Sequence, residues 1–94
     1  MKTFLPLGSV VRIQDYDKRL MIYGRAQKKS PQSGEVYDYI ACEYPLGSVD
    51  TKKGVLFNNE AITEMYYIGF QDAEELDYRT ALSKYLAEKD DGNI

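Results

Sequence analysis

The sequence contains no histidine, no tryptophan and only one cysteine. Without histidine, zinc sites built on imidazole and serine nucleophiles activated by a histidine base are excluded. The single Cys42 can form neither an intramolecular disulfide nor a cysteine zinc site, and no histidine is present to activate its thiol. We therefore interpret Cys42, which ends the apolar run from Tyr39, as a small buried hydrophobic residue.

Long apolar runs and nucleotide-binding signatures are also missing. No stretch approaches the length of a transmembrane helix, and the apolar part of the opening MKTFLPLGS is too short for a signal peptide. A secreted domain of this size usually carries several cysteines, so we expect a cytoplasmic protein. Neither a GxGxxG nor a Walker pattern occurs, and the neighbouring carboxylates Glu74, Glu75 and Asp77 are explained by helix capping. We expect no enzyme activity, no cofactor and no metal.

What the sequence does have is enough apolar material for one folded unit. Its 94 residues are 44% hydrophobic, which predicts a single domain over residues 1–94. Nine tyrosines are the compositional peculiarity. Tyrosine suits half-exposed strand positions and is also favoured at protein interfaces, and sheet cover is the simpler interpretation.

Alternation of side chains with a period of two predicts an antiparallel sheet over residues 5–70. In the first strand Val11 and Ile13 share one face, and in the second Leu20 and Ile22 do the same. The predicted strands are Ser9–Gln14, Arg19–Arg25, Val36–Tyr44, Val55–Phe57 and Ile62–Ile68.

Turn-forming residues separate these strands. Asp15 and Asp17 predict a tight hairpin turn, and Gly24 is expected to allow a bend or bulge. Gln27–Gly34 and Pro45–Lys53 are predicted surface loops. The motif PLGSV occurs twice, but the flanking residues do not match, so we interpret both copies as proline-glycine turns and not as a duplication.

After the sheet the apolar period changes to that of a helix, over residues 71–89. Asp72 followed by Glu75 is the aspartate form of a capping box, which predicts a helix start at about Asp72. The predicted apolar stripe consists of Tyr78, Leu82, Tyr85 and Leu86. This stripe should dock on the open face of the sheet or lie in a groove of a partner, and residues 90–94 should form a frayed tail.

These elements give an α+β fold, a small and strongly curled antiparallel sheet or barrel of about five strands with one C-terminal helix. A small closed barrel is the first expectation. An open sheet with the helix packed over its centre is the alternative.

Charge is unevenly divided along the chain. Residues 1–59 carry nine basic and six acidic side chains, whereas residues 60–94 carry three and nine. The basic residues could share an edge with Tyr16 and Tyr23 as stacking rings, which would suit a weak single-stranded nucleic-acid binding module. The acidic total argues against nucleic acid and favours solvated loop lysines. These basic residues are Lys18, Arg19, Arg25, Lys28, Lys29, Lys52 and Lys53.

Several short blocks in a fixed order carry a family resemblance between Leu5 and Leu76: LPLGSVV, KRLMIYGR, VYDYIACEYPLG, VLFNNEAI and YYIGFQDAEE. Together they resemble a small family of unknown function encoded beside LXG-domain toxins in type VII secretion loci of Gram-positive bacteria. The chain departs from the family pattern in its last strand, where Met65 and Tyr66 surround the usual valine and Phe70 replaces a tyrosine. The loop Ser48 to Lys53 is also its own.

The resemblance implies an accessory role without catalysis, as a cytoplasmic chaperone or adaptor that binds an LXG-type toxin or a secretion component. Immunity proteins are also small, acidic and encoded beside toxins, so neutralisation of a toxin domain is the alternative.

As a hypothesis, the partner binds to the sheet surface or edge near Tyr23, Arg25, Tyr37 and Tyr39. The alternative for Arg25 is a structural pairing with a helix or loop carboxylate. The oligomeric state is open, because an exposed sheet edge could also pair two copies.

Overall fold

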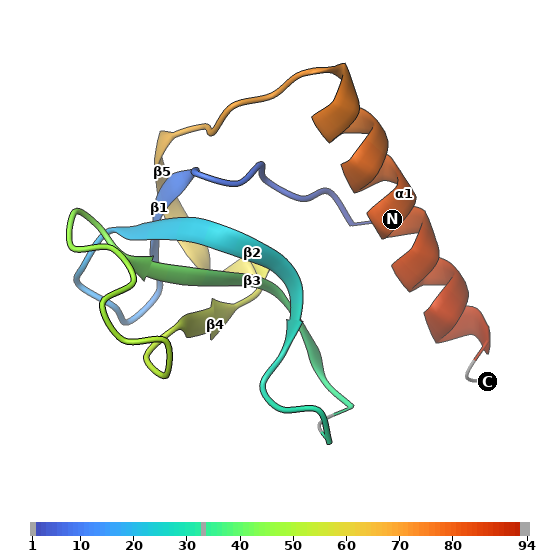
Figure 1. Cartoon of the computed structure of the whole chain (residues 1–94), viewed down its shortest axis with the longest axis horizontal. Coiled ribbons are helices and arrows are strands. Elements are labelled where there is room, and N and C mark those ends of the chain that lie inside the picture. Colours follow the sequence, from blue (N-terminus) through green and yellow to red (C-terminus); the bar gives the residue numbers. More distant parts are fainter. Residues whose placement is uncertain (1, 33, 93–94) are drawn as a thin grey trace.

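The computed structural model describes residues 2–32 and 34–92. Five strands form one open antiparallel sheet in the order β4-β3-β2-β1-β5 (Figure 1). The α+β prediction is confirmed, and the closed barrel is wrong. The 3-10 turn η1 covers Asn59–Ala61 and leads into the last strand. The strands are β1 (Val10–Ile13), β2 (Leu20–Lys28), β3 (Val36–Glu43), β4 (Val55–Phe57) and β5 (Ile62–Tyr67), and the helix α1 spans Ala73–Gly92.

The N-terminal segment, residues 2–6, covers part of the core face of the open sheet. Phe4 is fully buried there, and Leu5 packs against the same core. Asn59 donates from Nδ2 to the carbonyl of Thr3 at 2.9 Å, which ties the segment to the turn between the two edge strands β4 and β5. The inner surface is therefore covered without edge-to-edge pairing.

Strand β2 is longer than the sequence predicted. Gln27 pairs with Tyr37 and Lys28 with Val36, so the first two residues of the predicted loop continue the ladder. Ladder hydrogen bonds join main-chain groups and do not require apolar side chains, which is why the polar composition misplaced this boundary. The far part of the β2–β3 hairpin bends away from the rest of the sheet (Figure 1).

The bend in β2 has two visible causes. The register with β3 shifts between Ile22 and Gly24, which confirms the bulge expected at the glycine. Ala26 then adopts a φ of 54°, a left-handed conformation that is strained for a residue with a Cβ. Arg25 stands between these two irregular positions, and the bend sets the direction of its side chain.

The two PLGSV copies, Pro6–Val10 and Pro45–Val49, form turns as predicted. Gly8 has a φ of 88° and Gly47 a φ of 83°, values that favour glycine. The first copy leads into β1, whereas the second ends at Val49, which is 72% exposed and outside any strand.

The core of the domain surrounds Tyr39. Its ring lies edge-on to Phe4, with centroids 6.1 Å apart, and tilted against Phe57 at 5.4 Å. Its hydroxyl accepts a bond from the backbone N–H of Leu5 at 2.9 Å and donates to Oδ1 of Asn59 at 2.5 Å. The remaining buried members of the cluster are Val11, Ile13, Leu20, Ile22 and Ala41.

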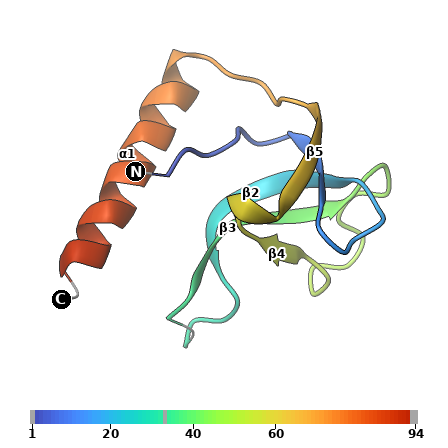
Figure 2. The same ribbon diagram turned by 180° about the vertical axis from the view of Figure 1, so that it is seen from behind.

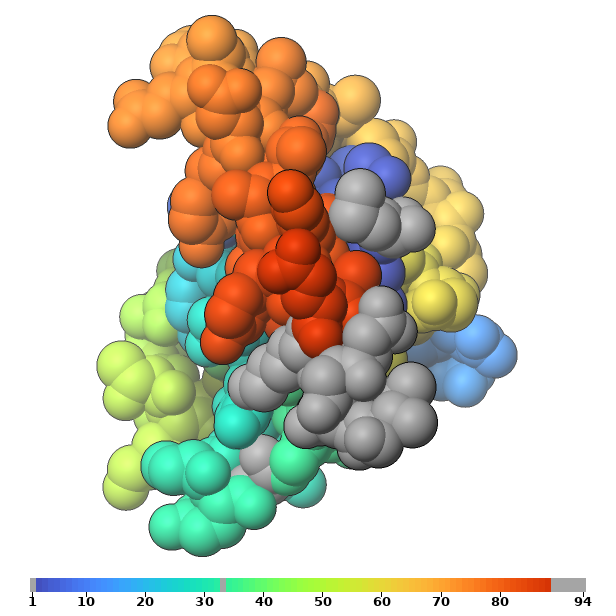
Figure 3. Space-filling view, turned by 90° about the vertical axis from the view of Figure 1, so that its right-hand side faces the viewer, coloured from blue at the N-terminus to red at the C-terminus, as the bar shows by residue number. Residues whose placement is uncertain are grey.

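Helix α1 lies across one end of the domain, beside the N-terminal segment, and not over the centre of the sheet (Figures 1 and 2). Arg79 donates to the carbonyl of Phe4 at 3.1 Å, and the hydroxyl of Ser83 donates to the carbonyl of Lys2. Leu82 and Leu86 pack against the core. Seen from the helix side, α1 largely covers the blue N-terminal segment (Figure 3).

The predicted apolar stripe is therefore only half right. Leu82 and Leu86 face the core, but Tyr78 and Tyr85 are 56% and 60% exposed. The docked face carries donors because the main-chain carbonyls of the N-terminal segment need hydrogen-bond partners.

The capping box is also half formed, because Glu75 donates its backbone N–H to Oδ1 of Asp72 but turns its carboxylate elsewhere. The helix extends to Gly92, so residues 90–92 do not belong to a separate tail, and residues 93–94 lie outside the described residues.

Candidate protein-interaction surface

The largest concentration of exposed apolar side chains lies on β5 and the segment that follows it. The edge strand β5 pairs with β1. Five residues at the end of β5 and just after it are each 45% exposed or more. We call this run the edge cluster. Its members are Met65 (47%), Tyr66 (45%), Tyr67 (61%), Ile68 (49%) and Phe70 (77%). Alternate residues of a strand face opposite sides, so the cluster exposes apolar side chains on both sides of the sheet edge. Exposed apolar residues that gather in one segment mark a candidate interaction site, whereas apolar residues scattered singly need no explanation.

Two hollows adjoin the edge cluster. The outer hollow, of about 400 Å³, is lined by Gly8, Val10, Arg19, Met21, Tyr44, Tyr66 and Tyr67. The helix-side hollow, of about 500 Å³, is lined by Leu7, Tyr23, Gly24, Arg25, Phe70, Asp72, Glu74, Glu75 and Tyr78. Because consecutive residues of the first PLGSV turn line the two hollows, the surface runs continuously past β5 to the start of α1.

The backbone at this junction is tightly fitted. Gly69 is buried, and a Cβ added to it would lie 2.0 Å from the carbonyl oxygen of Leu7. Its N–H donates to Oγ of the buried Ser9 at 3.0 Å, and that hydroxyl donates to the carbonyl of Pro6 at 2.8 Å. The fixed backbone here holds Phe70 and Leu7 outward on either side of the helix-side hollow.

Arg25 forms the floor of that hollow and is a structural residue. Its guanidinium donates to both carboxylate oxygens of Glu75, at 2.7 and 2.8 Å, and to the carbonyl of Leu5 at 3.3 Å. The guanidinium carbon lies 5.2 Å from the centre of the Tyr78 ring. The side chains of the ion pair are only 5% and 13% exposed. The alternative considered for Arg25, a helix carboxylate as partner, is what the structure contains.

The other three residues of the hypothesised site are dispersed. Tyr23 is 38% exposed and lines the helix-side hollow. Tyr37, farther along the β2–β3 hairpin, is half-buried and donates to Glu35 at 3.2 Å, whereas Tyr39 is fully buried in the core. Of the four residues, Tyr23 is the one that is exposed and also lines the hollow.

The basic residues proposed for nucleic acid do not form one edge. Lys18 and Arg19 precede β2 at the end of the sheet where Leu20 pairs with Glu43, whereas Lys28 and Lys29 lie at the far end of the β2–β3 hairpin. Arg25 is buried in its ion pair, and Arg19 packs over the Tyr44 ring with its guanidinium carbon 5.0 Å from the ring centre.

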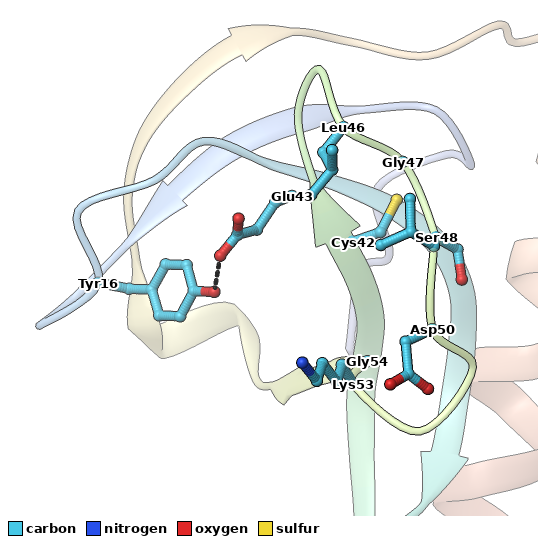
Figure 4. Close-up of a pocket in the computed structure, with 10 residues that line it drawn as sticks. Tyr16, Cys42, Glu43, Leu46, Gly47, Ser48, Asp50, Lys53 and Gly54 are labelled. Carbon is cyan, nitrogen blue, oxygen red and sulfur yellow. Dashed lines mark hydrogen bonds between the residues drawn. The ribbon is translucent and has the colours of Figure 1, made fainter.

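A third hollow of about 280 Å³ lies under the β3–β4 loop (Figure 4). Tyr16 donates to Glu43 at 2.6 Å on one side of it, with Asp50 and Lys53 at another. The bond to Glu43, followed by burial, raises the pKa of Tyr16, so this phenol remains a donor at neutral pH. Cys42 is buried, and its Sγ lies 3.7 Å from the carbonyl of Met21. This thiol therefore contacts a main-chain carbonyl and not a base.

Among the side chains that the structure describes in residues 2–32 and 34–88, no cluster of cysteine and acidic residues is arranged to hold a metal ion. In the same part of the chain, no helix combines the length and the apolar character that crossing a bilayer requires.

The sequence missed the edge cluster as a candidate site. Residues 62–68 are predicted as a strand, but their sequence does not show that this strand lies at the edge of the sheet with its aromatic residues exposed. The signal that could have found the site is the continuation of the apolar run past Gly69 to Phe70, into a polar linker where no core residue is expected.

A family model described as a domain of unknown function, DUF4176, matches residues 4–78. The matched region contains the whole sheet, the edge cluster and the residues that line the helix-side hollow. No curated protein and no solved structure matches the chain.

Proposed function

The chain belongs to the DUF4176 family, and we propose that it is a non-catalytic accessory protein that binds a protein partner through the edge cluster. The exposed run Met65 to Phe70 carries this proposal. A partner strand can add to the free edge of β5 through main-chain hydrogen bonds, while the rings on either side supply contact area.

The resemblance of the sequence blocks points to an LXG-type toxin as the partner, bound in the cytoplasm before delivery to a type VII secretion machine. An adaptor of this kind needs an adhesive surface and no reaction centre. Cys42 contacts a main-chain carbonyl and Tyr16 donates to Glu43, and neither contact provides an activated nucleophile.

Co-expression with an LXG-type toxin encoded beside the gene, followed by affinity capture, tests the proposal. We expect the double substitution Tyr67→Ser and Phe70→Ser to reduce capture by about tenfold or more, because aromatic residues dominate interface free energies. Val49→Ser is the matched control, since Val49 is 72% exposed and Phe70 77%, and Val49 lies on the β3–β4 loop.

Substitutions of Arg25 and Tyr39 are unsuitable for this test because both side chains are buried. Capture that is unchanged in the folded double variant would contradict binding through the edge cluster.

The alternative, immunity, is supported by the acidic balance of residues 60–94, with nine acidic against three basic side chains. Truncations of the toxin separate the two roles. A chaperone should capture the targeting or linker region and increase export, whereas an immunity protein should capture the toxic domain and restore the growth of cells that express it.

A further inference from the structure

We propose that the helix-side hollow binds a short partner segment in which a large apolar side chain stands next to a lysine or arginine. The inference rests on the proposed function only for the identity of the partner. It adds the chemistry of the segment that is bound.

Several side chains that line the hollow are large and apolar. Leu7 is 48% exposed, Phe70 77% and Tyr78 56%, and with Tyr23 they surround a space of about 500 Å³. A hollow of this size accepts a large side chain together with its backbone, and burial of an aliphatic or aromatic group there removes apolar surface of both partners from water.

Carboxylates give the same hollow a negative charge. Arg25 is the one cation among its lining residues, and the two hydrogen bonds to Glu75 already neutralise it. Asp72 and Glu74 are exposed and leave the lining with a net charge of about −2. The amino-terminal dipole of α1 offsets only about half a charge. The hollow therefore favours a cation and disfavours phosphate groups.

The apolar side chains and the negative charge together fit one kind of segment. A lysine or arginine covers aromatic rings with its aliphatic stem while its charged end reaches a carboxylate, and a guanidinium stacks well on tyrosine. The contact between Arg25 and Tyr78 already uses one face of a ring in this way. Tyr23, which also lines the hollow, offers a second ring to a cation.

Titration of the isotope-labelled protein with three designed peptides, followed by NMR, tests the inference. The peptides share one length and carry the central sequences KLFK, ELFE and KSSK. We expect KLFK to shift the amide signals of Tyr23, Phe70 and Tyr78, and the other two to bind about tenfold more weakly or worse. Salt should weaken KLFK binding, because the carboxylates of Asp72 and Glu74 are exposed to solvent.

Matched variants locate the effect. Glu74→Lys should weaken KLFK binding about fivefold or more, whereas Glu88→Lys, at an exposed position near the other end of α1, should change it less than twofold. Equal binding of KLFK and ELFE, or an unchanged affinity in Glu74→Lys, would overturn the inference.

The outcomes also separate this inference from the proposed function. Toxin capture without any KLFK binding would overturn the inference alone. Binding of KLFK at the hollow without toxin capture would support the inference and remove the toxin as the partner.

Discussion

The centre of the sheet and the dock of α1 are held by different kinds of contact. Around Tyr39 the contacts are apolar and aromatic, and the buried cluster contains Phe4, Leu20 and Ile22. Helix α1 is held by hydrogen bonds to carbonyls of the N-terminal segment and by one buried ion pair to Arg25 of β2, with two leucines packed against the core. Apolar burial is strong and tolerant of geometry, whereas a hydrogen-bonded ion pair is directional and contributes little net free energy. The sheet therefore supplies stability, and the dock supplies position.

The largest effect should come from breaking the sheet side. We expect Tyr39→Ala to lower the free energy of unfolding by about 4 kcal/mol, because it leaves a cavity between Phe4 and Phe57 and removes two hydrogen bonds. Urea denaturation followed by circular dichroism measures this. Tyr37→Ala, on the same strand, should cost less than about 1 kcal/mol, and equal losses for the two variants would contradict the central role of Tyr39.

Breaking the dock should have the next largest effect. Arg25→Leu leaves the Glu75 carboxylate, 13% exposed, without its partner, and we expect a loss of about 3 kcal/mol in urea denaturation. The double variant Arg25→Leu with Glu75→Leu should recover most of that loss, since no buried charge is left behind. If the double variant is as unstable as the single one, the ion pair itself contributes to the free energy of unfolding and does not only position the helix.

A third test uses the tyrosine hydroxyl that joins the two regions. Tyr39→Phe removes the acceptor of Leu5 and the donor to Asn59, and should cost about 1–2 kcal/mol at neutral pH.

The same variant has a pH signature. Burial raises the pKa of Tyr39 above its ordinary value of 10.0. Below pH 10 the hydroxyl is protonated in both the folded and the unfolded chain. Above it the unfolded chain ionises first, so stability falls as the pH rises toward the folded pKa. Unfolding free energies measured above pH 10 should decline less steeply in Tyr39→Phe than in the wild type, and parallel declines would contradict this assignment.

The smallest effect concerns the bend that presents Arg25 to the helix. Ala26→Gly relieves the left-handed strain at a φ of 54° and should stabilise the protein by about 0.5 kcal/mol. Gly24→Ala is the opposing control, because its Cβ would lie 2.7 Å from Cγ2 of Ile40. Thermal unfolding of the two variants should give midpoint shifts of opposite sign; a lower midpoint for Ala26→Gly would show that the strain is absent.

Sequence reasoning succeeded where one physical rule acted alone. Alternating apolar residues placed β1 and β2, and strand-favouring composition between turn residues placed the other three strands. Asp15 adopts a left-handed conformation in the predicted turn, but the connection from β1 to β2 spans residues 14–19 and is longer than a tight turn. Sequence reasoning failed where distant segments meet. Nothing local to Phe4 shows that the N-terminal segment fills the open face, and nothing local to Tyr78 shows that the helix docks through Arg79 and Ser83 instead.

The candidate site follows the same division. Tyr23 and Arg25, two predicted site residues from one block of sequence, both line the helix-side hollow. Their roles differ because Glu75, fifty positions away, occupies the guanidinium. The apolar run that continues to Phe70 could indicate an exposed residue, but the place of its side chain beside the hollow depends on the close approach of the backbones of Gly69 and Leu7.

The position of residues 2–6 between sheet and helix makes the dock of α1 depend on contacts between segments that are distant in the sequence. The bond from Ser83 to Lys2 spans 81 positions and that from Arg79 to Phe4 spans 75, whereas the β2–β3 hairpin closes over a short loop. Long loops are entropically costly to close before other contacts hold their ends together, so local pairings form faster. Helix α1 has no complete surface to receive it until the first residues lie on the folded sheet. The dock of α1 and the hollow beside it are therefore complete only where the first residues lie on the folded sheet.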